Sequence, residues 1–218
     1  MGFAFAQQSI EHFLSSATER RLFLIRLILS ILLIIGLQTT WVVLCLILLS
    51  LIVLWFFQGP YNGGADRMSL LILCCLGVAH FSPTIGWKEI AFGYLALQLI
   101  LSYFISGWVK IKNPEWRNGE ALCDIFQFSA YPASESLRKW ASSSRMLLFM
   151  SWGVIIFELL FPLSLLTKPS LIFALIIAAS FHLTNAFLFG LNRFFWIWIA
   201  AYPAIFWFQQ RILPNLSY

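Results

Sequence analysis

Long apolar runs separated by short polar segments dominate this chain, and they predict helices that cross a membrane. The runs cover residues 22–37, 41–57, 68–81, 90–109, 145–166, 171–189 and 194–208. A helix that crosses a bilayer needs about 20 apolar residues, so we expect the short run 68–81 to be partly buried or broken. Because unpaired strand edges cannot face lipid, the pattern predicts an all-α fold, a polytopic membrane helical bundle with about seven hydrophobic segments.

The first 21 residues carry a different pattern. Apolar residues recur there at helical spacing, with polar residues between them: Ile10, Phe13, Leu14 and Ala17. This spacing is typical of an amphipathic helix that lies on a membrane surface. We therefore divide the chain into an interfacial helix over 1–21 and a transmembrane domain over 22–210. Within that domain, the polar loop 110–144 is too long for a simple connection, and we expect one or two short surface helices in it.

Composition supports a membrane protein and argues against nucleic-acid binding. The chain is 61% hydrophobic and 11% charged, whereas soluble domains carry roughly 25% charged residues. Membrane lipids are therefore the expected partners of its surface. The net charge of +5 is spread over helix ends and one loop rather than gathered on a face. The four cysteines have no metal-ligand spacing, so we expect no metal site.

The basic residues also predict an orientation. Cytoplasmic loops carry an excess of Lys and Arg. If the N-terminus is inside, all but three of the 14 basic residues fall on the inner side, the exceptions being Lys88, Lys168 and Arg211. The sequence therefore favours an integral membrane protein with its N-terminus inside.

One stretch combines the end of a long apolar run with the most charged loop of the chain. On a helix, Tyr103, Ser106, Gly107 and Lys110 fall on one face. Asn113-Pro114 is expected to end that helix, because a residue before proline is disfavoured in the helical region. Lys110 has two interpretations. It either extends toward the headgroups as a terminal lysine or acts chemically at the membrane boundary.

Other polar residues lie within the apolar runs, where an ionisable group costs about 2.5–3.5 kcal/mol on insertion. Glu158 is the deepest, and it either pairs with Arg26 or another cation or serves a site. His182 and Asn185 are three residues apart and face the same way. They either form interhelical hydrogen bonds or take part in proton transfer. Asp66, beside Arg67, either caps a helix or belongs to the site.

Four motifs occur in a specific order along the chain. They are Tyr61 to Arg67 (YNGGADR), Tyr103 to Lys110 followed by Glu115-Trp116, Phe157 to Pro162 (FELLFP), and Phe181 to Phe189 followed by Phe194, Ala201 and Pro203. This set resembles the HTTM (horizontally transferred transmembrane) domain of the vitamin K-dependent gamma-carboxylase superfamily. Its form is similar to bacterial members of the sporulation-delaying protein B type. The resemblance covers residues 55 to 208.

The resemblance implies a function and a set of site residues. It implies a membrane enzyme-like protein of a bacterial cytoplasmic membrane that uses a reduced, vitamin K-like quinone to modify or mature a peptide with a partner protein. It implies catalytic roles for Lys110 and His182. Cofactor-binding roles are implied for Asn62, Asp66, Tyr103, Glu158 and Asn185. We expect Lys110, His182, Asn185 and Asp66 to approach one another in a polar pocket.

Two alternatives remain at this point. The chain is either such an enzyme or a non-catalytic membrane partner in peptide toxin maturation, export or immunity. A carrier or channel is weaker, because the sequence has no inverted repeat and no charged pore ring. We further expect Lys110 to be functional and Lys112 not, since Lys112 lies about 200° further round the helix and nearer to water.

Overall fold

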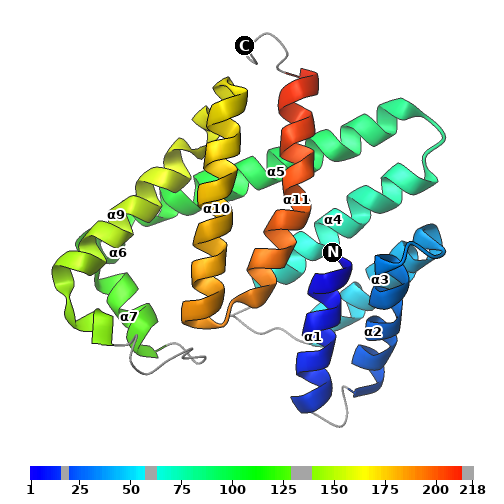
Figure 1. Ribbon diagram of the computed structural model, residues 1–218, viewed down its shortest axis with the longest axis horizontal. Coiled ribbons are helices and arrows are strands. Elements are labelled where there is room, and N and C mark those ends of the chain that lie inside the picture. The colour runs from blue at the N-terminus through cyan, green and yellow to red at the C-terminus, as the bar shows by residue number, and fades with distance from the viewer. Residues whose placement is uncertain (16–19, 57–62, 129–138, 213–218) are drawn as a thin grey trace. The chain divides into compact units, whose positions relative to one another are not determined.

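The computed structural model describes residues 1–15, 20–56, 63–128 and 139–212. Over these ranges the chain is helical apart from short turns, and no strand occurs among them (Figure 1). This confirms the all-α prediction. The chain forms two compact units, one of residues 1–95 with 196–201 and one of residues 96–195 with 202–218.

The first unit is built from the N-terminal helices. They are α1 (Gly2–Ser15), α2 (Arg20–Ile34), α3 (Thr39–Phe56), α4 (Gly63–Phe81) and the first part of α5 (Ile85–Lys112). Helices α1 and α2 lie side by side (Figure 1). A buried apolar cluster joins α1, α3 and α4: Phe5, Val42, Val43, Leu46 and Leu73.

Helix α1 buries a different face from the apolar stripe seen in the sequence. Phe5, Gln8 and Ser9 are buried, whereas Ile10 is 50% exposed. The side chains of Phe13 and Leu14, and all of Ala17, are outside the described part. A surface location for residues 1–21 stays a prediction.

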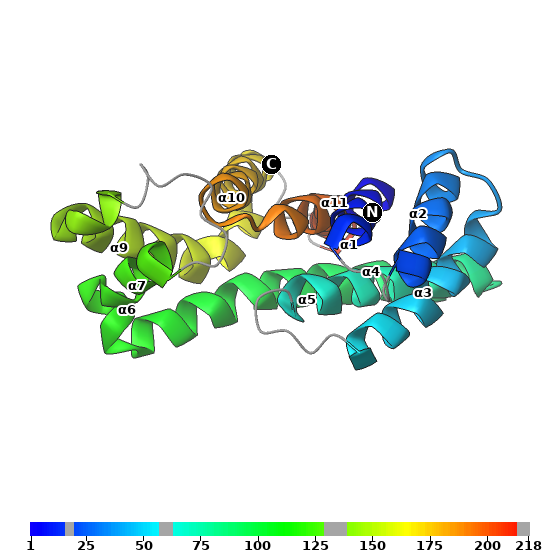
Figure 2. The same ribbon diagram turned by 90° about the horizontal axis from the view of Figure 1, so that it is seen from below.

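The second unit follows the middle of α5. It contains α6 (Pro114–Asn118), α7 (Glu120–Phe128), the 3₁₀ helix η1 (Lys139–Ser142), α9 (Ser144–Leu160), the 3₁₀ helix η2 (Phe161–Leu166), α10 (Lys168–Phe189) and most of α11 (Asn192–Ile212). Figure 2 shows α6 and α7 beside α9 at the C-terminal end of α5. Among its described residues, the polar loop therefore holds two short α-helices and the 3₁₀ helix η1, where one or two short helices were expected.

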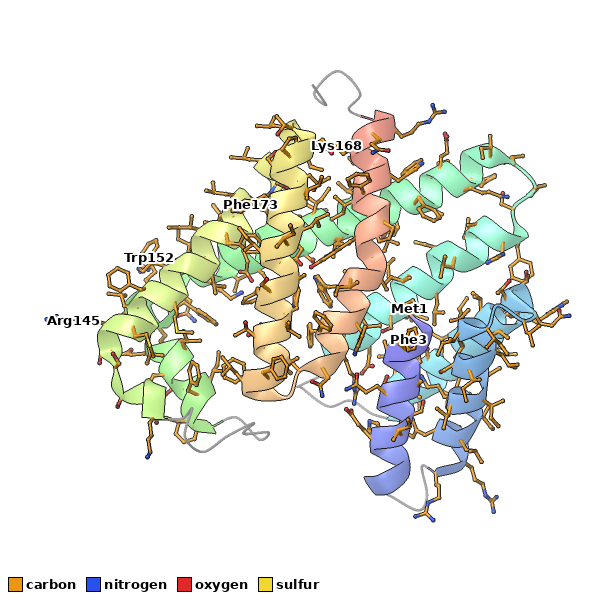
Figure 3. The ribbon with its side chains drawn as sticks, in the orientation of Figure 1. Met1, Phe3, Arg145, Trp152, Lys168 and Phe173 are labelled. Atoms are coloured by element: carbon orange, nitrogen blue, oxygen red, sulfur yellow. The ribbon has the colours of Figure 1, made fainter. Side chains whose placement is uncertain are left out.

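Four helices have the length and apolarity to cross a membrane. They cover Gly64–Phe81, Ile85–Lys112, Ser144–Leu166 and Lys168–Phe189, and Thr39–Trp55 is a shorter apolar helix. Large apolar side chains on these helices are exposed. Phe149 on α9 is 78% exposed, and Phe173 on α10, labelled in Figure 3, is 66% exposed. Exposure of such residues is expected where lipid covers the surface. Each of the seven predicted segments overlaps a helix, but seven spans are not confirmed.

Helix boundaries differ from the sequence prediction at three places. Helix α4 begins at Gly63, five residues before Met68, and so reaches 19 residues. Pro162 coincides with a change from α-helix to 3₁₀ helix at the end of α9. Pro203 lies inside a continuous α11, although proline usually breaks or kinks a helix. Membrane helices tolerate such prolines where neighbouring groups satisfy the freed backbone carbonyl.

Candidate functional site

An ion pair between α5 and α9 forms the centre of the candidate site. Lys110 Nζ lies 2.8 Å from Oε1 and 2.6 Å from Oε2 of Glu158. The Lys110 side chain is 16% exposed and that of Glu158 only 4%. A buried carboxylate needs a partner of this kind, because leaving it alone in a low dielectric is costly. The partner of the deepest acidic residue is thus Lys110.

The pair forms because α5 and α9 approach closely at Gly107. A Cβ at this position would lie 2.8 Å from the backbone nitrogen of Leu159 and 3.0 Å from Cβ of Glu158. Gly107 is one turn before Lys110, on the same face of α5. The missing side chain at position 107 therefore lets Lys110 reach Glu158.

Helix α6 brings an aromatic ring to the other side of Lys110. Lys110 Nζ lies 5.1 Å from the centre of the Trp116 ring, within cation–π range. The Asn113 side chain caps α6 by accepting from the Glu115 N–H at 2.9 Å, and Pro114 is in its first turn. The helix before α6 therefore ends at the Asn-Pro pair, as the sequence predicts.

Helix α9 holds α6 in place through two side chains. The Ser151 hydroxyl donates to the Trp116 carbonyl, and Trp152 Nε1 donates to the Arg117 carbonyl at 3.1 Å. Figure 3 shows Trp152 on α9. Gly119 ends α6 with φ +87°, and a Cβ there would lie 3.1 Å from the Leu148 nitrogen. These contacts fix Trp116 beside Lys110.

A second polar network lies within the same unit. The Tyr103 hydroxyl shares a hydrogen bond with His182 Nε2 at 2.9 Å and one with the Tyr202 hydroxyl at 3.3 Å. Tyr103 and His182 are both buried. Phe161 stacks on the Tyr103 ring with centroids 4.1 Å apart, and Phe157 packs on its edge. Glu158 lies next to Phe157 on α9, so one helix contributes to both networks.

A groove of about 430 Å³ runs along α5 to Lys110. Its lining residues are Gln98, Leu101, Ser102, Ile105, Ser106, Val109, Lys110 and Trp116. Lys110 belongs to this lining and Glu158 does not. Lys110 therefore both lines the groove and donates through its ammonium group to the buried carboxylate.

A family model for the HTTM domain matches residues 85–209, which is more than half of the chain. The chain belongs to the HTTM domain family. It is thus a membrane protein of the carboxylase-related superfamily, as the sequence motifs indicated. The matched region of the HTTM domain includes Tyr103, Lys110, Glu158, His182 and Tyr202. No curated protein and no solved structure matches the chain.

The HTTM domain brings some of the predicted site residues together and not others. Asn185 is half-buried on α10, one turn after His182, and its backbone carbonyl accepts from Gly190 and Leu191. Asp66 belongs to the first unit, where Gln8 Nε2 donates to its Oδ1 at 3.4 Å. Asn62 lies outside the described residues. The roles assigned to these residues, and the catalytic role of His182, stay predictions.

Sequence reasoning missed Tyr202, Trp116 and the reason for Gly107. Tyr202 had a usable signal, since a tyrosine inside an apolar helix needs a partner for its hydroxyl. Trp116 was noted only as part of a motif. Among the described residues, no group of three or more His, Cys, Asp or Glu has the arrangement of a metal site.

Proposed function

We propose that this HTTM protein deprotonates a hydroxyl group of a membrane-dissolved, reduced quinone-like molecule, with Lys110 as the residue that contacts the hydroxyl. The observation that supports the proposal is that Lys110 lines the groove and also donates to Glu158. In this proposal, a proton from a molecule in the groove passes to Glu158 through Lys110. The two residues then act as a relay rather than as a simple ion pair.

The relay keeps the charge of the site constant. The hydroxyl proton passes to Lys110 Nζ as Lys110 releases one of its protons to Glu158, 2.6 Å away. Before the transfer the groups are a hydroxyl, an ammonium and a carboxylate. Afterwards they are an oxyanion, an ammonium and a carboxylic acid. Because the net charge is zero in both states, the transfer creates no uncompensated charge in a low dielectric.

The groove has the character that a reduced quinone requires. Ser106 and Lys110 supply hydrogen-bonding groups, and the flat Trp116 ring offers a stacking surface. Its volume lies within the range of small-molecule sites. When bound, a reduced quinone of vitamin K type supplies electrons for oxygen chemistry. The Tyr103–His182–Tyr202 network links α5 to α10 and α11 and so holds the helix in position.

The biological role that we propose is modification or maturation of a peptide, delivered by a partner protein in a bacterial cytoplasmic membrane. The resemblance to carboxylases and to the sporulation-delaying protein B type supports this role. The fold supports it indirectly, since a lipid-facing groove beside a proton relay suits a lipid-soluble cofactor.

The test uses a probe that reports its own ionisation. We choose a decyl-substituted 4-methoxy-1-naphthol, a monoether of a naphthohydroquinone, whose anion absorbs at longer wavelength than its neutral form. The wild-type protein in detergent is expected to bind the anion at neutral pH. Lys110→Ala and Lys110→Arg are expected to bind only the neutral form, because arginine cannot release its proton.

Lys112→Ala is the matched control. Lys112 is exposed, and its Nζ lies 4.6 Å from the centre of the Trp108 ring. Its replacement should leave the anion spectrum unchanged. A Lys110→Arg variant that still binds the anion would rule out the relay and leave a purely electrostatic role. Anion binding by Lys110→Ala would exclude a role of Lys110 in forming the anion. It would favour the alternative that this protein is a non-catalytic membrane partner.

A further inference from the structure

A buried polar junction joins η2 to α11. Gln209 on α11 is fully buried, with 0% of its surface exposed. Its Nε2 donates to the backbone carbonyl of Leu165 in η2 at 3.0 Å. That carbonyl lies at the C-terminal end of a helical segment, where backbone acceptors lack a partner within the helix. Gln209 therefore ties α11 to the end of η2.

The amide group of Gln209 keeps one atom without a protein partner. If the amide were reversed, its oxygen would face the Leu165 carbonyl and two acceptors would repel, so the orientation is fixed. The amide oxygen Oε1 is buried, and no described residue donates to it. A buried acceptor without a donor is costly, and native proteins rarely leave one unpaired.

Ser164 presents a second such group at the same junction. Side chains three residues apart eclipse one another in a 3₁₀ helix, so Ser164 shares a face of η2 with Phe161, and both residues are buried. In the part of the chain that the structure describes, the buried Ser164 hydroxyl has no hydrogen-bond partner. The next residue is Leu165, whose carbonyl Gln209 binds. Both unsatisfied groups therefore belong to the contact between η2 and α11.

The hydroxyl groups at the start of α10 are already engaged. The Ser170 hydroxyl donates to the Ser164 carbonyl at 2.8 Å. Thr167 and Ser170 form the capping box that begins α10. Because these hydroxyls satisfy backbone groups, the Ser164 hydroxyl and the Gln209 amide oxygen need a partner of another kind.

We infer that one water molecule binds at this junction and bridges Ser164 Oγ and Gln209 Oε1. The water donates one O–H to the amide oxygen and accepts the serine proton, so it satisfies both groups. The second lone pair of the Leu165 carbonyl is available for its other O–H. Buried waters typically make about three hydrogen bonds of this kind. This inference is independent of the proposed function.

The charges around the junction favour water over a monovalent cation. The groups that meet there are hydroxyls, an amide and backbone carbonyls, which carry no net charge. Lys168 Nζ lies 5.7 Å from the centre of the Phe206 ring, and Phe206 is one turn before Gln209 on α11. Because this ammonium group repels a second cation, a neutral ligand is preferred.

The water site has a consequence for the end of α9. Segment η2 directly continues α9, and Phe161 at its start stacks on Tyr103. A water that fixes η2 on α11 therefore also limits the movement of α9 near Glu158.

The direct test is a crystal structure of the full chain at a resolution that shows ordered water. We expect one peak within hydrogen-bonding distance of both Ser164 Oγ and Gln209 Oε1. A second crystal soaked in rubidium salt identifies the ligand, since rubidium gives an anomalous signal and water does not. A direct bond between the two side chains, no peak between them, or an anomalous peak would each overturn the inference.

Thermal unfolding in detergent tests the bridge in solution. Ser164→Ala should lower Tm by about 2–4 °C, the shift expected for one lost hydrogen bond in a chain of this size. Gln209→Met should lower Tm further, because it also removes the bond to Leu165. The double variant should be no less stable than Gln209→Met alone, since the bridging water is already lost.

Ser180→Ala is the matched control, at an exposed position of α10, and it should leave Tm unchanged. Losses that add up in the double variant would show that Ser164 and Gln209 act separately and would contradict the bridge. If a variant fails to fold, the crystal structure of the wild-type chain still decides.

Discussion

The absence of a side chain at position 107 is what allows a lysine and a glutamate from different helices to meet in the membrane. Gly107 lies against the Leu159 backbone and the Glu158 Cβ. The glycine costs helix stability relative to alanine, roughly 0.5–1 kcal/mol, so its presence inside α5 needs a reason. Close approach of α5 to α9 is that reason.

Gly107→Ala is therefore expected to destabilise the protein by about 1–3 kcal/mol, as overpacking does in closely packed interiors. Because the added methyl group meets backbone atoms, the helices must separate and the Lys110–Glu158 pair should break. Thermal unfolding in detergent, followed by tryptophan fluorescence, measures the first effect, and anion binding by the naphthol probe measures the second.

Gly153→Ala is the matched control, since a Cβ at this α9 position meets nothing within 4 Å. It should leave stability equal or slightly higher. If both substitutions behave alike, close packing at Gly107 is not what holds the pair together.

Single residues also show how much of the site can be predicted from the sequence. The shared face of Tyr103 and Lys110 followed from helical spacing alone, and both residues lie in polar networks of the second unit. The partner of Lys110 did not follow, because Glu158 is 48 positions away and helix pairing depends on packing across the fold. Gly107 was visible only as a small residue, and its role requires the structure of α9.

At the scale of elements, α6 directly follows the membrane helix α5 and holds Trp116 beside Lys110. Its start is predictable, because Asn113-Pro114 both ends α5 and caps the following turn. The docking of α6 on α9 is not predictable, since it depends on a hydroxyl of α9 that no pattern in the sequence distinguishes. Ser151 makes that contact by donating to the Trp116 carbonyl.

Ser151→Ala should loosen α6 from α9 and move the Trp116 ring away from Lys110. A lost hydrogen bond of this kind is worth about 0.5–1.5 kcal/mol, which corresponds to a loss of probe affinity of about two- to tenfold. A titration of the naphthol probe measures it. Ser180→Ala, at an exposed position of α10, should have no effect. Equal losses of affinity in the two variants would contradict the role of the Ser151 hydrogen bond in holding α6.

At the scale of the whole molecule, the apolar helices make this an integral membrane protein, and the basic residues predict its orientation. A 23-residue candidate span, Ser144–Leu166, lies between the α6–α7 segment and Lys168 in the chain. The two ends of this span should therefore face opposite sides of the membrane. The positive-inside rule predicts that the α6–α7 side is cytoplasmic.

Cysteine labelling in intact cells tests this orientation. In a variant lacking the four native cysteines, Lys168→Cys should react with an impermeant maleimide added outside, and Glu115→Cys should react only after lysis. Both positions are exposed. Labelling of Glu115→Cys in intact cells would reverse the assigned orientation, and labelling of both would reject the span between them.

The central claim, that Lys110 passes a proton to Glu158, is tested most directly by infrared difference spectroscopy of the wild-type protein on binding of the naphthol probe. The relay predicts that the carboxylate bands of Glu158 disappear and that the C=O stretch of a protonated carboxylic acid appears together with the naphtholate signal. Glu158→Gln should lack this band. Formation of the naphtholate without a protonated carboxylic acid in the wild-type protein would contradict the account.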